Sequence, residues 1–427
     1  MPHWPWLQPA AATARRATPF VLRRNKCFSP ASVCASPSIH DRAQEEEEER
    51  KSLVVVGGGA AGVYASIRAK TLAPHLNVLV IDKGKFLSKV KISGGGRCNV
   101  TNGHHLEPSG LARNYPRGHK ELRGSFFSTH GPQDTMHWFS DHGVELKAGK
   151  SVSSASVSDS GKFVLKVEKR TVDFVDYVNA NYVLVATGSS QQGYSIATQH
   201  GHSIIAPVPS LFTFKIADKR LSDLSGVTFT RVKAKLMLDG IQKSAPELTQ
   251  TGPMLVTHWG LSGPVVLRLS AWGARELYQE KYQAKLMVDF IPDIHIEDVK
   301  RILFQHKDQH ASLDGDMHWA TIPKNHLNAI ALQLKQWMFE VVGKGQFKDE
   351  FVTAGGVPLS EISLNTMESK KQPNLFFAGE VLNVDGVTGG FNFQNAWTGG
   401  YIAGTSIGTL ASSSNLRPQA CLQLEAS

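Results

Sequence analysis

The sequence has few cysteines and no long apolar run. Only four of its 427 residues are cysteine, and no two of them form a C-x-x-C pair. This excludes a disulfide scaffold and a dithiol redox motif, and it favours a reducing compartment. No stretch approaches the roughly eighteen consecutive apolar residues of a membrane span, so no membrane partner is predicted.

Signatures of metal and nucleic-acid binding are also lacking. His306 and His310 have i, i+4 spacing but lack the glutamate of an H-E-x-x-H motif, so both are interpreted as surface residues and no metal is predicted. The net charge is +9, yet residues 1–44 hold six basic side chains and one acidic one. The +4 that remains is ordinary for a soluble domain, so a nucleic-acid partner is not favoured.

Residues 1–44 have the composition of an organellar transit peptide. Five Lys or Arg residues and no acidic residue precede Asp41, amid Ala, Ser, Pro and Thr, and a long apolar centre is missing. The Ser and Pro content favours the chloroplast, with the mitochondrion as the alternative. The glutamate run 45–49 then marks a solvated boundary before the first strand.

A glycine-rich turn between two apolar runs is the most informative motif. The turn 57–62 follows the apolar run 53–56, and a second apolar run, 78–81, ends on Asp82. Strand, G-x-G-x-x-G turn, helix, strand and acid in this order are typical of a Rossmann-type dinucleotide site. A pyrophosphate would rest on the helix N-terminus, and Asp82 would accept hydrogen bonds from a ribose. The residues expected here are Gly57, Gly59, Ala60, Ala61, Gly62, Asp82 and Lys83.

A second segment suited to a polar ligand lies far along the chain. The apolar strand 374–378 ends on Gly379 and Glu380, and a glycine-rich turn with Gly390 opens a helix-like stretch, 391–410. Another strand, 182–186, ends on a Thr-Gly turn. One long cofactor with a pyrophosphate, a sugar-like chain and an anionic ring would use all of these segments, and FAD fits. The residues expected at this end are Thr187, Gly188, Gly379, Glu380, Gly390, Asn392 and Gln394, the two amides at the flavin pyrimidine edge.

The chain is predicted to be α/β, with a discontinuous Rossmann-type domain. The first part spans 45–205 and the second 350–411, followed by a tail, 412–427. An inserted domain, 206–349, is expected to be mainly β with helices, because 233–238 alternates while 296–305 and 326–338 have helical patterns.

Three further strings carry a resemblance to a known family. They are S-G-G-G-R-C-N-V-T-N at 93–102, T-H-W-G-L-S-G-P at 257–264 and T-A-G-G-V at 353–357. With the turn 57–62, they resemble the BaiN-like (YhiN-like) family of FAD-dependent oxidoreductases, some of which reduce carbon–carbon double bonds conjugated to a ketone. The resemblance implies an FAD domain of the glutathione-reductase superfamily with a family-specific insert. It also implies that Glu380 contacts the ribityl chain and that plant relatives lie in plastids.

One connection departs from the family pattern. The run 143–146 is followed after a few residues by 151–154, which is too short for a parallel crossover. The connection is therefore an antiparallel hairpin, or the chain is a shortened form.

The remaining candidates lie in the family strings. Arg97, Cys98 and Asn99 could line the flavin ring, although a small buried side chain is the favoured interpretation of Cys98. His258 could donate a proton to the substrate. The alternative is a capped helix start, with Ser262 or Gly263 at the N-cap and Pro264 in the first turn.

The first functional hypothesis is an FAD-dependent oxidoreductase that passes hydride from NAD(P)H through the flavin to an unsaturated or carbonyl small molecule. There is no second G-x-G-x-x-G, so NAD(P)H must reach the flavin near the insert. An RNA-modifying flavoprotein and a truncated, inactive flavin-binding variant are the alternatives. The RNA-modifying alternative needs a basic patch on the insert. The candidate basic residues of the insert are interspersed with acidic ones; they are Arg220, Arg231, Lys233, Lys235 and Lys243.

Overall fold

The structure is a computed structural model whose described residues all belong to one compact unit, Arg50–Ser427. The described residues are 51–92, 101–102, 105, 107–138, 147–148, 150–157, 163–169, 175–218, 221–238, 246–309, 319–345 and 352–413. Within these ranges, none of the helices combines the length and the apolar character needed to cross a lipid bilayer.

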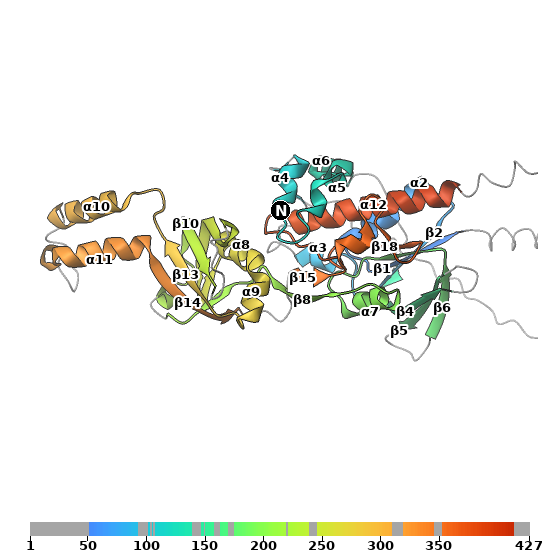
Figure 1. Cartoon of the computed structure of the whole chain (residues 1–427), viewed down its shortest axis with the longest axis horizontal. Helices are drawn as coiled ribbons and strands as arrows, with labels where there is room; N and C mark the ends of the chain where they lie inside the picture. Colours follow the sequence, from blue (N-terminus) through green and yellow to red (C-terminus); the bar gives the residue numbers. More distant parts are fainter. Residues whose placement is uncertain are drawn as a thin grey trace, which may run out of the picture. The chain divides into compact units, whose positions relative to one another are not determined.

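A seven-stranded, mainly parallel sheet forms the centre of the fold (Figure 1). In spatial order its strands are β16 (Ile362–Ser363), β17 (Glu368–Ser369), β18 (Leu375–Phe377), β7 (Tyr182–Val185), β1 (Ser52–Val56), β2 (Asn77–Asp82) and β3 (Lys147–Ala148). From β18 to β3 all neighbours are parallel, so the carboxyl ends of these strands meet at one edge. The apolar runs predicted to be strands are β1 and β7, and their side chains are buried on both faces, as in parallel sheets.

Two long helices pack closely on each other beside this sheet. They are α2 (Ala60–Leu72) and α12 (Phe391–Ser413). Glycines spaced four apart on α12 face alanines spaced four apart on α2, in the pairs Gly400 with Ala61, Gly404 with Ala65 and Gly408 with Ala69. A Cβ atom added to any of these glycines would lie 2.5 to 3.2 Å from the carbonyl oxygen of the paired alanine. The pairs follow the same order in both helices, so the helices run parallel and begin at the same end.

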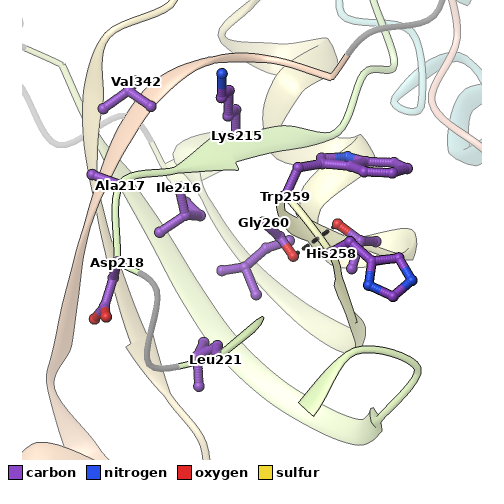
Figure 2. A pocket seen from close by; sticks show the side chains of 11 residues that line it. Lys215, Ile216, Ala217, Asp218, Leu221, His258, Trp259, Gly260 and Val342 are labelled. Carbon is purple, nitrogen blue, oxygen red and sulfur yellow. Dashed lines mark hydrogen bonds between the residues drawn. The ribbon is translucent and has the colours of Figure 1, made fainter. Parts of the chain in front are cut away.

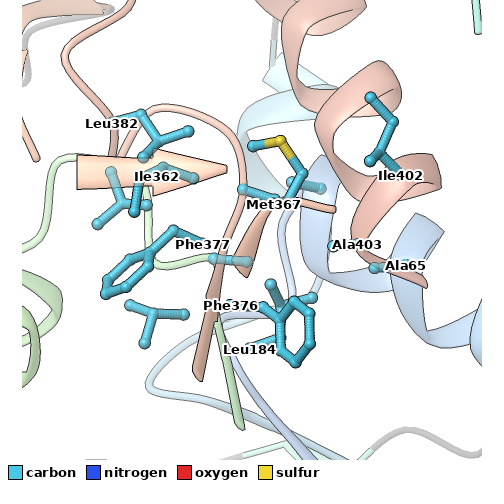
Figure 3. Close-up of a cluster of buried hydrophobic side chains, with 14 of the residues drawn as sticks. Ala65, Leu184, Ile362, Met367, Phe376, Phe377, Leu382, Ile402 and Ala403 are labelled. Carbon is cyan, nitrogen blue, oxygen red and sulfur yellow. The ribbon is translucent and has the colours of Figure 1, made fainter. Parts of the chain in front are cut away.

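The main hydrophobic core lies between the sheet and this helix pair (Figure 3). Phe376 and Phe377 of β18 are fully buried, and Leu184 of β7 packs in the same cluster. Ile402 and Ala403 of α12 close the cluster from the helix side. This packing fixes where β18 ends and α12 begins, two places where the sequence predicts ligand contacts.

A smaller antiparallel sheet and a helix accompany the other face of the central sheet (Figure 1). The elements are β4 (Lys150–Val157), β5 (Phe163–Lys169), β6 (Val175–Ala180) and α7 (Gln191–Gln199). The strands on either side of the short connection belong to different sheets, because β3 pairs with β2 while β4 pairs with β5. No parallel crossover is needed there, and the antiparallel hairpin lies one step later, between β4 and β5. The expected strand 144–146 lies outside the described residues.

The predicted insert contains a closed six-stranded barrel. Around the barrel the strands are β10 (Thr228–Met237), β11 (Thr249–Thr257), β12 (Gly260–Ser262), β9 (Phe214–Ile216), β14 (Trp337–Lys344) and β13 (Ala284–Asp289). Its helices are α8 (Pro264–Trp272), α9 (Ala274–Gln279), α10 (Ile296–Gln309) and α11 (Lys324–Lys335). The chain leaves the central domain along β8 (Ile205–Ser210) and returns along β15 (Val352–Gly356), which pair antiparallel. The helix expected at 326–338 ends earlier than predicted, because Trp337 pairs with Val288 of β13.

Short helices fill the loops between β2 and β3. They are α3 (Ser88–Ile92), α4 (Pro108–Ala112), α5 (Phe126–Thr129) and α6 (Pro132–Trp138). The helix expected at 133–142 corresponds to α6, and its second half lies outside the described residues.

Candidate functional site

The glycine turn after β1 leaves open space at the start of α2. Gly57 has φ +109°, and a Cβ atom there would lie 2.3 Å from the carbonyl oxygen of Ala186. Gly59 is the N-cap of α2, no side chain caps the helix, and a Cβ atom on Gly59 would meet nothing within 4 Å. The first N–H groups of a helix have no partner within the helix, so this opening suits a phosphate.

Asp82 is held beside the same turn. One carboxylate oxygen accepts a hydrogen bond from the Gly58 N–H and the other from the Gly84 N–H, both at 2.7 Å. A carboxylate oxygen can accept a further bond, so Asp82 keeps acceptor capacity for a ribose hydroxyl. The neighbouring Lys83 is exposed.

The three strand ends predicted from remote parts of the sequence lie together. A Cβ atom on Gly188 would lie 3.8 Å from a carboxylate oxygen of Glu380, and one on Gly379 would lie 3.1 Å from the Cβ atom of Ala61. Gly57 packs against the backbone of Ala186, the residue that follows the neighbouring strand β7. The segments near positions 57, 188 and 380 therefore meet at the carboxyl edge of the sheet, where open α/β sheets bind ligands in a crevice; this meeting place is here called the crevice.

Glu380 is positioned by contacts on both sides. One carboxylate oxygen accepts a hydrogen bond from the Thr353 N–H at 3.0 Å, and the other lies 3.3 Å from the Lys89 ammonium of α3. Burial raises the pKa of Glu380, and the Lys89 charge opposes this shift. The Glu380 carboxylate is thus held by one backbone N–H and one ammonium.

Two buried hydroxyls beside Glu380 were not predicted from the sequence. The hydroxyl oxygens of Tyr194 and Thr353 make no hydrogen bond of normal geometry within the part of the chain that the structure describes. Burial raises the pKa of Tyr194 to about 12, and the Glu380 charge adds to the effect. The two hydroxyls lie close to each other, and a polar ligand could complete their hydrogen bonding, so they fit a bound cofactor. Thr353 stands in the T-A-G-G-V string, whereas Tyr194 sits in an ordinary amphipathic helix without any sequence signal.

The start of α12 packs against the end of the family string 93–102. A Cβ atom on Gly390 would lie 2.6 Å from the Thr101 backbone, and the Asn102 side chain donates to the Gly389 carbonyl at 2.9 Å. These contacts place Thr101 and Asn102 beside the helix start. Arg97, Cys98 and Asn99 lie outside the described residues, so their roles stay predictions.

The amides of Asn392 and Gln394 make hydrogen bonds within the chain. The Asn392 amide accepts from the Gly386 N–H and donates to the Gly386 carbonyl, both at 2.8 Å, and so holds the turn before α12. Gln394 is fully buried, and its amide bonds to Thr101, Thr135 and Thr398. Both amides are thus engaged within the chain, and their contact with the flavin edge stays a prediction.

The polar cluster around Gln394 includes a buried histidine. His130 is 2% exposed, its Nε2 lies 2.7 Å from the Tyr64 hydroxyl, and its ring stacks on Tyr401 at 4.2 Å. Burial lowers the pKa of His130 to about 4. The ring is therefore neutral and shares a hydrogen bond with the Tyr64 hydroxyl, whose own pKa is raised by burial.

We expect this histidine to make stability depend on pH. An unfolded His gains its proton below about pH 6.5, whereas folded His130 gains it only near pH 4. The unfolded state binds more protons between these values, so stability falls as pH falls through that window, by up to ~3 kcal/mol. Urea unfolding at pH 7 and pH 5 should show about 2 kcal/mol of this loss for the wild type and for the exposed control His75→Gln, and a smaller loss for His130→Gln. An equal loss in His130→Gln would refute the assignment.

Arg117 pairs with Asp385 of the central domain and also contacts helix α8 of the insert. Arg117 pairs through two nitrogens with the fully buried carboxylate of Asp385, which also accepts from Ser210 at 2.8 Å. Arg117 donates in addition to the carbonyl of Ala271 in α8, at 2.8 Å. Removing one member of such a pair leaves a buried charge, so this junction holds the barrel against the loop that precedes α12.

His258 stands on the barrel, at the exposed turn between β11 and β12. Among the described residues, no contact joins it to the crevice residues. The capped helix start is confirmed, since Gly263 is the N-cap of α8 and Pro264 is its first residue. His310 lies outside the described residues, and within them no cluster of His, Cys, Asp and Glu could hold a metal ion.

The fold and the crevice define a dinucleotide-binding protein with a Rossmann-type domain and an inserted barrel. The HI0933-like protein Rossmann domain family matches residues 51–173 and 144–406, so the chain belongs to that family. The resemblance to BaiN-like (YhiN-like) proteins is thereby confirmed, and the family is one of FAD-dependent oxidoreductases.

Curated relatives cover most of the chain. A 3-dehydro-bile acid delta(4,6)-reductase of Clostridium scindens is 28% identical over 81% of this chain and 96% of its own length. A ribosomal RNA dihydrouridine synthase of Haemophilus influenzae is 29% identical over 82% of this chain and 96% of its own length. A protein of the same name from Escherichia coli is 27% identical over 79% of this chain and 93% of its length.

Solved structures are more distant. The open conformation of a flavocytochrome c3 fumarate reductase has a TM-score of 0.42 at 15% identity and covers 88% of this chain and 82% of its own. A 3-ketosteroid-delta4-(5alpha)-dehydrogenase from Rhodococcus jostii has a TM-score of 0.44 at 13% identity and covers 84% and 97%. Likenesses of this size carry no argument about function.

Proposed function

We propose that this protein binds one FAD and transfers hydride from NAD(P)H to a carbon–carbon double bond conjugated to a carbonyl group. The observation that supports it most is the crevice shared by the segments near 57, 188 and 380. Two further features fit FAD: the open space at Gly59, and the buried hydroxyls of Tyr194 and Thr353.

Different residues of the crevice would bind different parts of the cofactor. The Gly57–Gly59 turn and the start of α2 would hold the pyrophosphate, and Asp82 a ribose. Glu380 would accept hydrogen bonds from the ribityl hydroxyls. Because α12 runs parallel to α2 and begins at the same end, its positive N-terminus would lie near the flavin ring. When bound, the flavin supplies two-electron hydride chemistry; this chain's share is positioning and charge stabilisation.

The relatives suggest the class of substrate. A delta(4,6)-reductase and a dihydrouridine synthase are named for adding hydrogen to ring double bonds. In both substrates the double bond is conjugated with a carbonyl group, so a shared hydride addition supports an electron-poor alkene for this chain. The relatives differ in the size of the substrate, from a small steroid acid to ribosomal RNA.

RNA modification is the second candidate, and the two synthases favour it. The barrel offers only a partial basic surface for RNA. Lys233 is exposed on β10, but Arg231 of the same strand pairs with Asp293 at 3.0 Å. Arg220 and Lys243 lie outside the described residues.

Anaerobic reduction tests the proposal and separates the candidates. Under argon, NADPH or NADH should bleach the flavin absorption of the purified holoprotein. The reduced protein is then offered a conjugated cyclic enone or a uridine-containing ribosomal RNA fragment, and the acceptor that restores the oxidised spectrum identifies the substrate class. A flavin that stays yellow with both nucleotides would contradict the proposed donor.

A further inference from the structure

A pocket on the barrel is not explained by the FAD crevice (Figure 2). It has a volume of about 360 Å³ and lies between β9, the turn that joins β11 to β12, and β14. Ile216, Leu261 and Val342 supply apolar lining, and Lys215, His258 and Trp259 stand at its rim. Its size is within the range of small-molecule sites.

The aromatic rim is held by backbone contacts. Trp259 is 44% exposed, and its ring lies 6.4 Å from the His258 ring at an angle of 51°. The Ile216 N–H donates to the Trp259 carbonyl at 3.1 Å, and the Thr257 hydroxyl donates to the Gly260 carbonyl at 3.0 Å. The turn is therefore fixed while its two rings remain open to solvent, which is the arrangement of a stacking platform.

The pocket has two charged side chains, Lys215 and Asp218, on different sides. Lys215 is exposed, and within the described residues its ammonium forms no ion pair. The Asp218 carboxylate lies on another side, as Figure 2 shows. An exposed ammonium without an ion pair suits a phosphate.

Trp259 also lies next to Gly345, which follows β14. A Cβ atom on Gly345 would lie 3.5 Å from the indole nitrogen of Trp259, and β15, which carries Thr353, begins only seven residues later. A ligand on Trp259 would thus lie beside the end of β14.

We propose that this pocket binds the nucleotide portion of the electron donor NAD(P)H, with a planar ring on Trp259 and a phosphate at Lys215. The inference rests on the proposed function, because it assigns a site to the donor that function needs. The sequence has no second G-x-G-x-x-G turn to bind that donor. An aromatic platform with a nearby cation recognises a planar ring joined to a phosphate without such a turn.

The test is rapid anaerobic reduction of the holoprotein at increasing NADPH or NADH concentrations, which gives a dissociation constant and a limiting rate. Trp259→Leu and Lys215→Gln should each raise the dissociation constant about tenfold, a change typical of a lost stacking or phosphate contact. The limiting rate and the bound FAD should stay near wild type. Matched controls on the barrel are Lys285→Gln and Tyr278→Leu, which are exposed outside the pocket and should change neither value.

The outcomes separate this inference from the function it rests on. If the wild-type flavin is not reduced by either nucleotide, the donor assignment fails before any variant is compared. If the wild type is reduced and both pocket variants keep its dissociation constant, the pocket assignment alone is overturned. Weaker binding of a uridine-containing RNA by Trp259→Leu, with donor binding unchanged, would likewise overturn it.

Discussion

Gly59→Val is expected to lower FAD affinity at least about a hundredfold, or ~2.7 kcal/mol, while the apo-protein stays folded. The free space at Gly59 is the reason: the added side chain meets nothing in the protein and fills the opening where a pyrophosphate would lie. The loss of apo stability should not exceed the ~1 kcal/mol of an unfavourable N-cap residue. FAD fluorescence titration and urea unfolding of the apo-protein measure the two effects separately.

Gly57→Ala should behave differently from Gly59→Val, because it damages the fold itself. Its φ of +109° and the Ala186 carbonyl 2.3 Å away oppose any side chain, so we expect a stability loss of ~3 kcal/mol or more. Gly343→Val is the matched control for Gly59→Val and should leave the FAD affinity unchanged. A Cβ atom on Gly343 also meets nothing within 4 Å, but this residue lies in barrel strand β14. Wild-type FAD affinity in Gly59→Val would show that this opening is not the pyrophosphate site.

The second large effect is expected in the helix pair. Alanine is a better helix former than glycine by about 1 kcal/mol, so Gly399→Ala in α12 should stabilise the protein or leave it unchanged. A Cβ atom at Gly399 has its nearest neighbour at 3.5 Å, an ordinary contact. At Gly404 the same atom would lie 2.5 Å from the Ala65 carbonyl oxygen and would push α12 away from α2. Overpacking of this kind costs ~1–3 kcal/mol.

Gly404→Ala should therefore be less stable than Gly399→Ala by about 2 kcal/mol or more, although both are glycine-to-alanine changes in one helix. It should also bind FAD more weakly, because both helix starts border the crevice. Urea unfolding of the two variants is the measurement. Equal stabilities would mean that the close packing of α2 on α12 does not govern the fold.

The fold could be predicted where local sequence decides it. The apolar runs 53–56 and 182–185 are buried parallel strands, and the G-x-G-x-x-G turn lies between β1 and α2. The convergence of the segments near 57 and 380 was also predictable, because acids and glycine turns that end parallel strands meet at one sheet edge. The family strings supported the same cofactor.

The rest depends on contacts between distant residues. Asn392 and Gln394 have the right chemistry for a flavin edge, but only tertiary packing shows that their amides bond within the chain. Tyr194 carries no local signal, since its helix pattern would be the same without a ligand. The short link after position 146 looked incompatible with parallel strands, and it is explained by a switch to a second sheet.

Fragment competition tests most directly whether one FAD joins the Gly57 turn to Glu380. Apo-protein is titrated with FAD, with ADP, which carries the pyrophosphate half, and with riboflavin, which carries the ring and ribityl chain. We predict one FAD bound per chain, with an affinity far above that of either fragment, and displacement of both fragments by that single FAD. Stoichiometric FAD that leaves ADP bound, or a protein that takes up no FAD, would contradict the account.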